Sequence, residues 1–150
     1  MTIRNPKGEA LTALILETFR INGELLSAGN RLTKPFGLTS ARWQVIGAID
    51  EAGQPLTVSQ IARRMGLARQ GVQRIVNDLK KADLLKAEPN IDHKRAPLFS
   101  ISAHGEAVMS QVNTAQAEWV NSLAENHDPE QIAQALELLQ SLRNTLEKQD

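Results

Sequence analysis

The sequence predicts a mainly α-helical fold with one small β-hairpin. Apolar residues recur at helical spacing along most of the 150 residues. That spacing is interrupted between residues 84 and 101, where two short apolar runs flank a polar loop, as in a hairpin. Just before these runs, a short helix, a tight glycine-containing turn and a second helix are expected in succession. This order indicates a winged helix-turn-helix, with long helices at both ends of the chain.

Helix start and stop signals place the elements of the first half. A first helix is expected over about residues 7–31, where apolar residues follow helical rather than alternating spacing. Thr39 has the position of an N-cap for a second helix. Thr57 and Gln60 have the spacing of a capping box, which predicts a short third helix that ends at Gly66.

The second half contains the expected hairpin and three further helices. A fourth helix is expected from about residue 69 to 82. Residues 84–88 and 97–101 are short enough for strands, and the loop between them joins them into a hairpin. Ser102 is a candidate cap for a long fifth helix. The Asp-Pro pair at 128–129 predicts the start of a sixth, because aspartate caps helices well and proline is favoured at the first helical position.

Charges are unevenly distributed, although 17 basic and 17 acidic residues give a net charge of zero. Residues 60–95 hold nine basic and four acidic side chains, whereas residues 96–150 hold two basic and eight acidic ones. A basic middle and an acidic end are typical of a polyanion-binding segment on a scaffold that repels polyanions. Chance clustering on solvated helices is the alternative, so the placement of the charges decides between them.

Residues that enzymes and metal sites require are absent or poorly spaced. The lack of cysteine excludes disulfides, thiolate metal sites and thiol-based redox sensing. His93, His104 and His127 lack metal-ligand spacing, and the glycines of residues 66–71 are not followed by the lysine of a phosphate-binding loop. We expect no catalytic residue, metal or cofactor, and hence no enzyme. The longest aliphatic run is too short to cross a bilayer and no signal peptide is visible, so a cytoplasmic protein without membrane partners is expected.

The expected fourth helix has one apolar and one polar face. Val72, Ile75 and Val76 fall on the apolar face, so that arginine, glutamine and asparagine side chains point away from the core. In the major groove arginine pairs with guanine and glutamine with adenine, and the first turns of a recognition helix contact the bases. The hairpin loop adds a second basic probe, suited to an adjacent minor groove or to the backbone. The candidate DNA-binding residues are Ser59, Arg69, Gln70, Gly71, Gln73, Arg74, Asn77, His93, Lys94 and Arg95.

The terminal helices have apolar stripes that suit a partner. Apolar residues recur every three or four positions in the last two helices, close to a heptad pattern, and the first helix is apolar around more than one stripe. The stripe residues are Val108, Val112, Ala115, Trp119 and Leu123, then Ile132, Ala135, Leu139, Leu142 and Leu146. We expect the whole of residues 1–150 to form one unit, with residues 7–34 and 102–148 forming a homodimer around a DNA-binding lobe at 36–101. Packing of the last two helices on each other within a monomer is the alternative.

In its order of elements and in four motifs, the chain resembles the MarR (multiple antibiotic resistance regulator) family. The motifs span residues 38–46, 56–62, 65–76 and 92–105, from LTSARWQVI in the second helix to DHKRAPLFSISAHG in the wing. The resemblance covers about residues 10–147. It implies an obligate homodimer that binds a pseudo-palindromic double-stranded DNA operator and usually represses. It also implies release of DNA when a small, often phenolic, anion binds between the dimer helices and the DNA-binding lobe.

Departures from the family pattern concern the wing and the start of the fourth helix. The wing of the family usually has Asp-x-Arg, but here Lys94 takes the place of the arginine and Arg95 follows, so which of them reaches DNA is open. Ala68 stands where a capping serine or threonine is common, which weakens the helix start by up to about 1 kcal/mol. For an aromatic or phenolic effector, the candidate pocket residues are Phe36, Arg42 and Trp43, although core packing explains Trp43 equally well.

Two other functions are compatible with the sequence. A winged-helix protein–protein interaction module would dimerise but ignore DNA even at low salt. A small hydrolase or lyase with an unrecognised site would need a deep pocket lined by convergent titratable groups.

Overall fold

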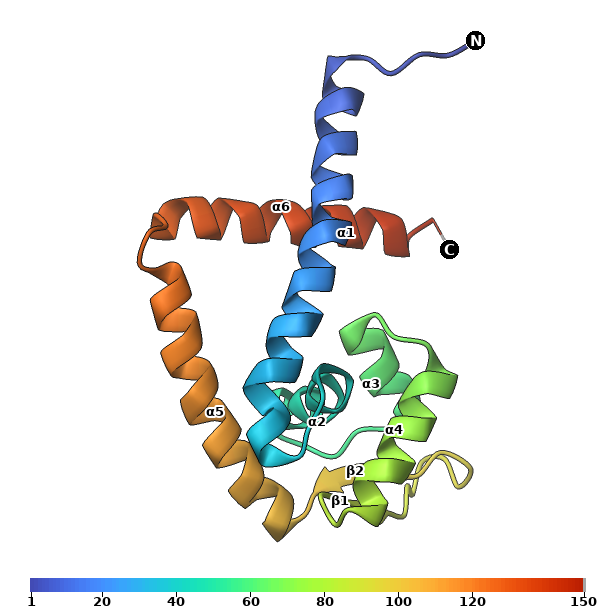
Figure 1. The fold of residues 1–150 in the computed structure, drawn as a ribbon. Coiled ribbons are helices and arrows are strands. Elements are labelled where there is room, and N and C mark those ends of the chain that lie inside the picture. Colours follow the sequence, from blue (N-terminus) through green and yellow to red (C-terminus); the bar gives the residue numbers. More distant parts are fainter. Residues whose placement is uncertain (150) are drawn as a thin grey trace. The chain divides into compact units, whose positions relative to one another are not determined.

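The computed structural model describes residues 1–149. They form six α-helices, one 3₁₀ helix and a two-stranded sheet (Figure 1). In chain order the elements are α1 (Pro6–Thr33), η1 (Lys34–Phe36), α2 (Ser40–Ala52), α3 (Val58–Met65), α4 (Arg69–Lys81), β1 (Leu85–Glu88), β2 (Leu98–Ile101), α5 (Ala103–Ala124) and α6 (Pro129–Glu147). The mainly helical fold with a small hairpin is therefore confirmed.

The chain divides into two compact units within α5. Residues 1–113 hold α1 to α4, both strands and the first half of α5, and the second unit begins at Thr114. The first unit contains a hydrophobic core drawn from α2, α3, α4, the strands and α5. Its largest fully buried apolar side chains are Val45, Ile46, Leu56, Ile61, Val72, Val76, Leu79, Leu85, Met109 and Val112. Because the helix-turn-helix and the hairpin share this core, their surfaces are held in a fixed relation to each other.

Capping explains where most helices begin. Thr39 and Asp128 cap α2 and α6 through their side-chain oxygens, as expected. Thr57 and Gln60 form both hydrogen bonds of a capping box at α3. Ala68 precedes α4 in an extended conformation and has no side chain that accepts a hydrogen bond. The weak start predicted for α4 is therefore present in the structure.

The hairpin pairs β1 and β2 antiparallel, with Leu85 opposite Ile101. Each strand is one residue shorter than expected. Leu84 donates its N–H to the carbonyl of Leu79 and so belongs to the turn that closes α4, with an N–O distance of 2.9 Å. Pro97 has no N–H to contribute to the ladder. The strand boundaries predicted at 84 and 97 were therefore wrong by one residue.

A backbone bridge fixes the hairpin to the segment before α3. Leu56 donates to the Phe99 carbonyl at 3.0 Å, and Phe99 donates to the Leu56 carbonyl at 2.7 Å. Both side chains are buried. The hairpin base and the start of α3 thus move as one piece.

Two close approaches of the backbone connect the lobe to its long helices. The Ser40 hydroxyl of α2 donates to the Leu26 carbonyl of α1 at 2.6 Å, and Gly29 faces that hydroxyl so closely that a Cβ would overlap it. The Ser102 hydroxyl donates to the Asp83 carbonyl at 2.5 Å and accepts from the N–H of Gly105 at 2.9 Å, which confirms Ser102 as the cap of α5. A Cβ on Gly105 would likewise overlap the Leu84 carbonyl, so glycine is required at both crossings.

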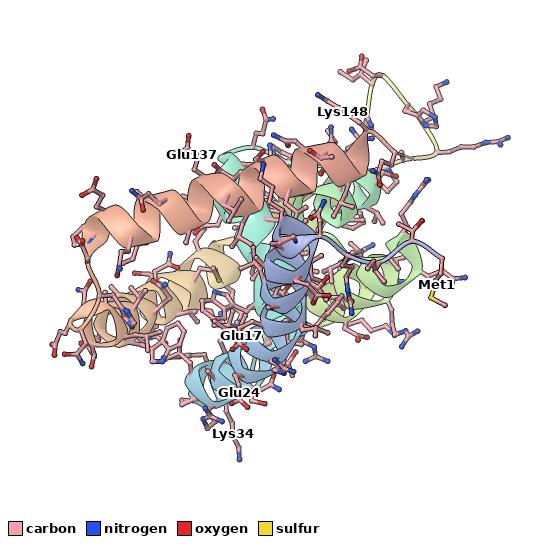
Figure 2. The ribbon with its side chains drawn as sticks, turned by 90° about the horizontal axis from the view of Figure 1, so that it is seen from above. Met1, Glu17, Glu24, Lys34, Glu137 and Lys148 are labelled. Atoms are coloured by element: carbon pink, nitrogen blue, oxygen red, sulfur yellow. The ribbon has the colours of Figure 1, made fainter. Side chains whose placement is uncertain are left out.

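Large apolar side chains remain exposed on three helices, of which α5 contributes Val120 and Leu123. On α1 these are Leu11, Ile15, Leu16, Phe19, Ile21, Leu25 and Leu26, and on α6 they are Ile132, Leu136, Leu138, Leu139 and Leu146. Glu17 and Glu24, labelled in Figure 2, lie on the same helix as the first set. Of the stripe predicted on α5, Val112 is instead buried in the core of the first unit, and Val108 is partly buried against that core. Among residues 1–149, no helix has both the length and the apolar character of a membrane span.

Candidate nucleic-acid interface

Residues 58–81 form the expected helix-turn-helix. α3 ends at Gly66, which has φ of +64°, a conformation that favours glycine, and Leu67 donates to the Ala62 carbonyl at 2.9 Å to close the turn. α4 then buries Val72 and Val76 completely. This packing turns the opposite face of α4 outward.

The outward face of α4 holds polar side chains from its first three turns. Arg69, Gln70, Gln73, Arg74 and Asn77 are all exposed, as predicted from the helical spacing. Gly71 is half-buried, and a Cβ built on it meets nothing within 4 Å. The face therefore offers two guanidinium and three amide groups beside a stretch of bare backbone.

One shallow hollow joins α3, α4 and the hairpin loop, and we call it the wing-side hollow. Its lining residues are Thr57, Val58, Ser59, Arg69, Gln70, Gln73, Arg95, Ala96 and Pro97. Five of the ten candidate DNA-binding residues thus come together here. Arg95 lines the hollow, whereas His93 and Lys94 lie further out in the loop and do not contribute to its lining.

The hairpin loop is held by Asn90, which was not among the candidate residues. Its side-chain nitrogen donates to the Ala96 carbonyl at 2.9 Å, and its side-chain oxygen accepts from the N–H of Asp92 at 3.2 Å. These bonds close the loop just before the second strand. Asparagine after proline is a common turn signal, so Asn90 could have been identified from the sequence.

A second hollow lies against the turn of the helix-turn-helix, and we call it the turn-side hollow. It is lined by Ser59, Ala62, Arg63, Leu67, Ala68 and Arg69. Arg63 was not singled out from the sequence. Its signal was the spacing of four residues from Ser59, which places both side chains on one face of α3.

Four arginines of α3, α4 and the hairpin loop carry uncompensated charge. Among residues 1–149, Arg63, Arg69, Arg74 and Arg95 form no ion pair with a carboxylate. In contrast, Arg42 of α2 pairs with Asp78 of α4, with 3.7 Å between nitrogen and oxygen. The surface is therefore attractive to a polyanion.

The three residues predicted for an effector pocket lie on and beside α2. Phe36 and Trp43 pack against the hydrophobic core, so core packing accounts for both side chains. Arg42 is partly exposed and keeps its charge paired with Asp78. Arg42 is the one residue of these three that carries a charge, and it is partly exposed.

The family model and the solved structures that match this chain name the same family. Residues 36–96 match the MarR family. An uncharacterized protein of Mycobacterium tuberculosis (strain H37Rv) is 34% identical over 121 residues, which are 81% of this chain and 83% of that protein.

Solved structures with similar folds include a MarR/EmrR family transcriptional regulator from Acinetobacter sp. ADP1. Its TM-score is 0.79 at 20% identity, with 97% of this chain and 99% of that chain covered. AbsC, a MarR family transcriptional regulator from Streptomyces coelicolor, has a TM-score of 0.77 at 17% identity, covering 99% of both chains. The M. tuberculosis transcriptional regulator MOSR in complex with DNA has a TM-score of 0.72 at 18% identity, covering 88% and 96%. At these identities the structures establish the fold.

Proposed function

The chain belongs to the MarR family, and from this premise we propose that it is a sequence-specific DNA-binding repressor that acts as a homodimer. The observation that carries the proposal is the wing-side hollow. Ser59 of α3, Arg69 of α4 and Arg95 of the hairpin loop all line it. Its family and fold are those of transcription regulators, which supports a binding role rather than an enzymatic one.

In this proposal α4 enters the major groove of a double-stranded operator. Arg69 and Arg74 would pair with guanines or phosphates, and Gln70 and Gln73 with adenines, because the donors of these side chains match those base edges. The half-buried Gly71 would allow the backbone of α4 to approach the DNA. The hairpin residues His93, Lys94 and Arg95 would contact the backbone or the adjacent minor groove.

The proposed dimer is formed by the helical regions 7–34 and 102–148, which precede and follow the DNA-binding lobe at 36–101 in the sequence. It is supported by the row of exposed leucines, isoleucines and Phe19 on α1 and by the exposed leucines on α6. Exposed apolar rows of this size are unusual for a monomer and mark interaction surfaces. A two-fold dimer would place two recognition helices about 34–36 Å apart, so the operator should be a near-palindrome.

Release from DNA is proposed to follow from a small aromatic or phenolic anion that binds near Phe36, Arg42 and Trp43. The support is the Arg42–Asp78 ion pair between α2 and α4, at 3.7 Å. An anion that pairs with Arg42 would compete with Asp78 and so weaken one of the contacts that hold α4 in place.

The experiment begins with selection of bound fragments from genomic DNA by the wild-type protein, with and without candidate aromatic acids. Gel shifts with a selected fragment then compare wild type with Arg69→Ala and Arg74→Ala. Each substitution should weaken binding by about 1–3 kcal/mol, while mass by ultracentrifugation and helicity by circular dichroism stay unchanged. A dimer that selects no fragment at low salt would favour the protein–protein interaction module. Unaltered affinity of both variants would show that α4 is not the recognition helix.

A further inference from the structure

The turn-side hollow contains polar groups that base reading by α4 does not use. Arg63 reaches it from the last turn of α3 and Arg69 from the first turn of α4, while Ser59 adds a hydroxyl. The buried Ala62, the half-buried Leu67 and the exposed Ala68 complete its lining. Two guanidinium groups and one hydroxyl therefore converge on a hollow with no carboxylate in its lining.

This combination of donors matches a phosphodiester group. Arginine binds phosphate through two parallel N–H bonds, and serine hydroxyls are frequent phosphate ligands in DNA complexes. A carboxylate ligand of a protein partner would fit the guanidinium groups too, but Ser59 and Arg69 line both this hollow and the wing-side hollow, so an elongated polyanion suits the two hollows better. A DNA strand bound at one hollow would therefore also come close to the other.

We propose that the turn-side hollow binds a backbone phosphate of the operator, with Arg63 as its principal ligand. The proposal rests on the function proposed above and extends it, since it adds a phosphate contact in the last turn of α3 to the contacts proposed for Ser59, the recognition helix and the wing. The protein footprint then runs from Arg95 through Ser59 to Arg63. Because phosphate contacts position a protein without reading bases, Arg63 would contribute affinity and salt dependence but no sequence preference.

Arg64 provides a matched control for Arg63. The two arginines are neighbours on α3, both are exposed, and neither forms an ion pair among residues 1–149. Successive residues of a helix point about 100° apart, and Arg64 does not line the hollow. Loss of either side chain changes the net charge equally, so only a specific contact can distinguish the two variants.

The experiment measures the affinity of full-length Arg63→Ala, Arg64→Ala and Arg63→Lys for a wild-type-selected fragment at several sodium chloride concentrations. With two copies per dimer and about 0.9 counterions per phosphate, Arg63→Ala should flatten the log–log salt slope by about 2. Its affinity near 0.1 M salt should fall at least about tenfold, with the ranking of fragment variants unchanged. Arg63→Lys should retain most of the slope, because lysine also neutralises phosphate. Arg64→Ala should stay within about threefold of wild type.

The possible results distinguish failure of the phosphate site from failure of the proposed DNA-binding function. Equal behaviour of Arg63→Ala and Arg64→Ala would overturn the phosphate site while leaving the DNA-binding function intact. An altered base preference in Arg63→Ala would also overturn it, because the residue would then read sequence. A wild-type protein that binds no DNA would refute the proposed function itself, and the site with it. Denaturant unfolding of the three variants verifies that each is folded.

Discussion

Gln73 donates a hydrogen bond to Asn77 along the exposed face of α4, with 3.1 Å between Nε2 and Oδ1. The two residues are four positions apart, which places them one above the other on the helix. A glutamine amide has two N–H groups and a carbonyl oxygen. The bond to Asn77 uses one N–H, so the other N–H and the carbonyl remain free to pair with the two groups of an adenine edge. Asn77 thus orients Gln73 without occupying the groups that would contact a base.

Asn77→Ala should therefore reduce discrimination at the adenine that Gln73 contacts. Gln73 would have to be immobilised on binding, at a cost of about 0.5–1.5 kcal/mol, which is a roughly two- to tenfold loss. Asn77→Asp keeps the acceptor for Gln73 but adds a negative charge beside the phosphates, so it should weaken all sites alike and preserve their ranking. Competition gel shifts against operator variants with each adenine replaced measure both effects. A uniform loss in Asn77→Ala would contradict an orienting role.

Gly71→Ala should stabilise the fold and weaken DNA binding. A glycine inside a helix costs about 0.5–1 kcal/mol relative to alanine, and a Cβ at Gly71 meets no atom of the protein within 4 Å. The added methyl group would instead lie on the surface that faces the DNA. Gly47→Ala in α2 is the control, because a Cβ there also meets nothing within 4 Å. Urea unfolding should show a similar gain in both variants, whereas only Gly71→Ala should lose affinity in gel shifts.

The wing should contact DNA mainly through Arg95. Arg95 lines the hollow beside Ser59 and α4, while Lys94 does not. Arg95→Ala should weaken operator binding by about 1–3 kcal/mol, and Lys94→Ala, which removes the same charge from the same loop, should cost less than about 1 kcal/mol. Fluorescence anisotropy at fixed salt compares the two variants. A larger loss for Lys94→Ala would assign the contact to the residue that follows the family spacing.

The sequence predicted those features of the fold that depend on local chemistry. The capping box of Thr57 and Gln60 and the glycine turn at Gly66 could be located because each needs only residues a few positions apart. The outward face of α4 followed from helical spacing alone. The bridge between Leu56 and Phe99 could not be predicted, because its partners are distant in the chain and pair only once the core has formed.

In the candidate site, too, residues on one helix could be predicted from the sequence, whereas contacts between distant segments could not. Arg69 and Gln73 were identified from their positions on one helix, but the choice between Lys94 and Arg95 depends on how the hairpin loop folds back towards α3. The spacing of Arg63 from Ser59 places both on one face of α3, but only the fold shows that this face adjoins the first turn of α4.

Gly29→Ala should destabilise the contact between α1 and α2. Its Cβ would overlap the Ser40 hydroxyl, and overpacking of this kind costs about 1–3 kcal/mol. Ser40→Ala removes that hydroxyl and its bond to the Leu26 carbonyl, at a cost of about 1 kcal/mol. The double variant should be more stable than the sum of the two losses predicts, because the overlap no longer exists. Urea unfolding of all four proteins measures this coupling, and strictly additive losses would show that the backbone relaxes instead.

Phe19→Glu should convert the proposed dimer into monomers. Phe19 is 71% exposed on α1, and a charge buried in an apolar interface without a partner is strongly unfavourable. At about 100° per residue, Leu11, Ile15 and Leu26 share the wide apolar side of the helix with Phe19, whereas Ala13 lies opposite, between Glu9 and Glu17. Ala13→Glu therefore adds the same charge on the polar side and should leave the dimer intact. Sedimentation equilibrium distinguishes the two, and the monomeric variant should also lose affinity for a two-half-site operator, since each subunit then binds alone. A dimeric Phe19→Glu protein would exclude this face of α1 from the subunit interface.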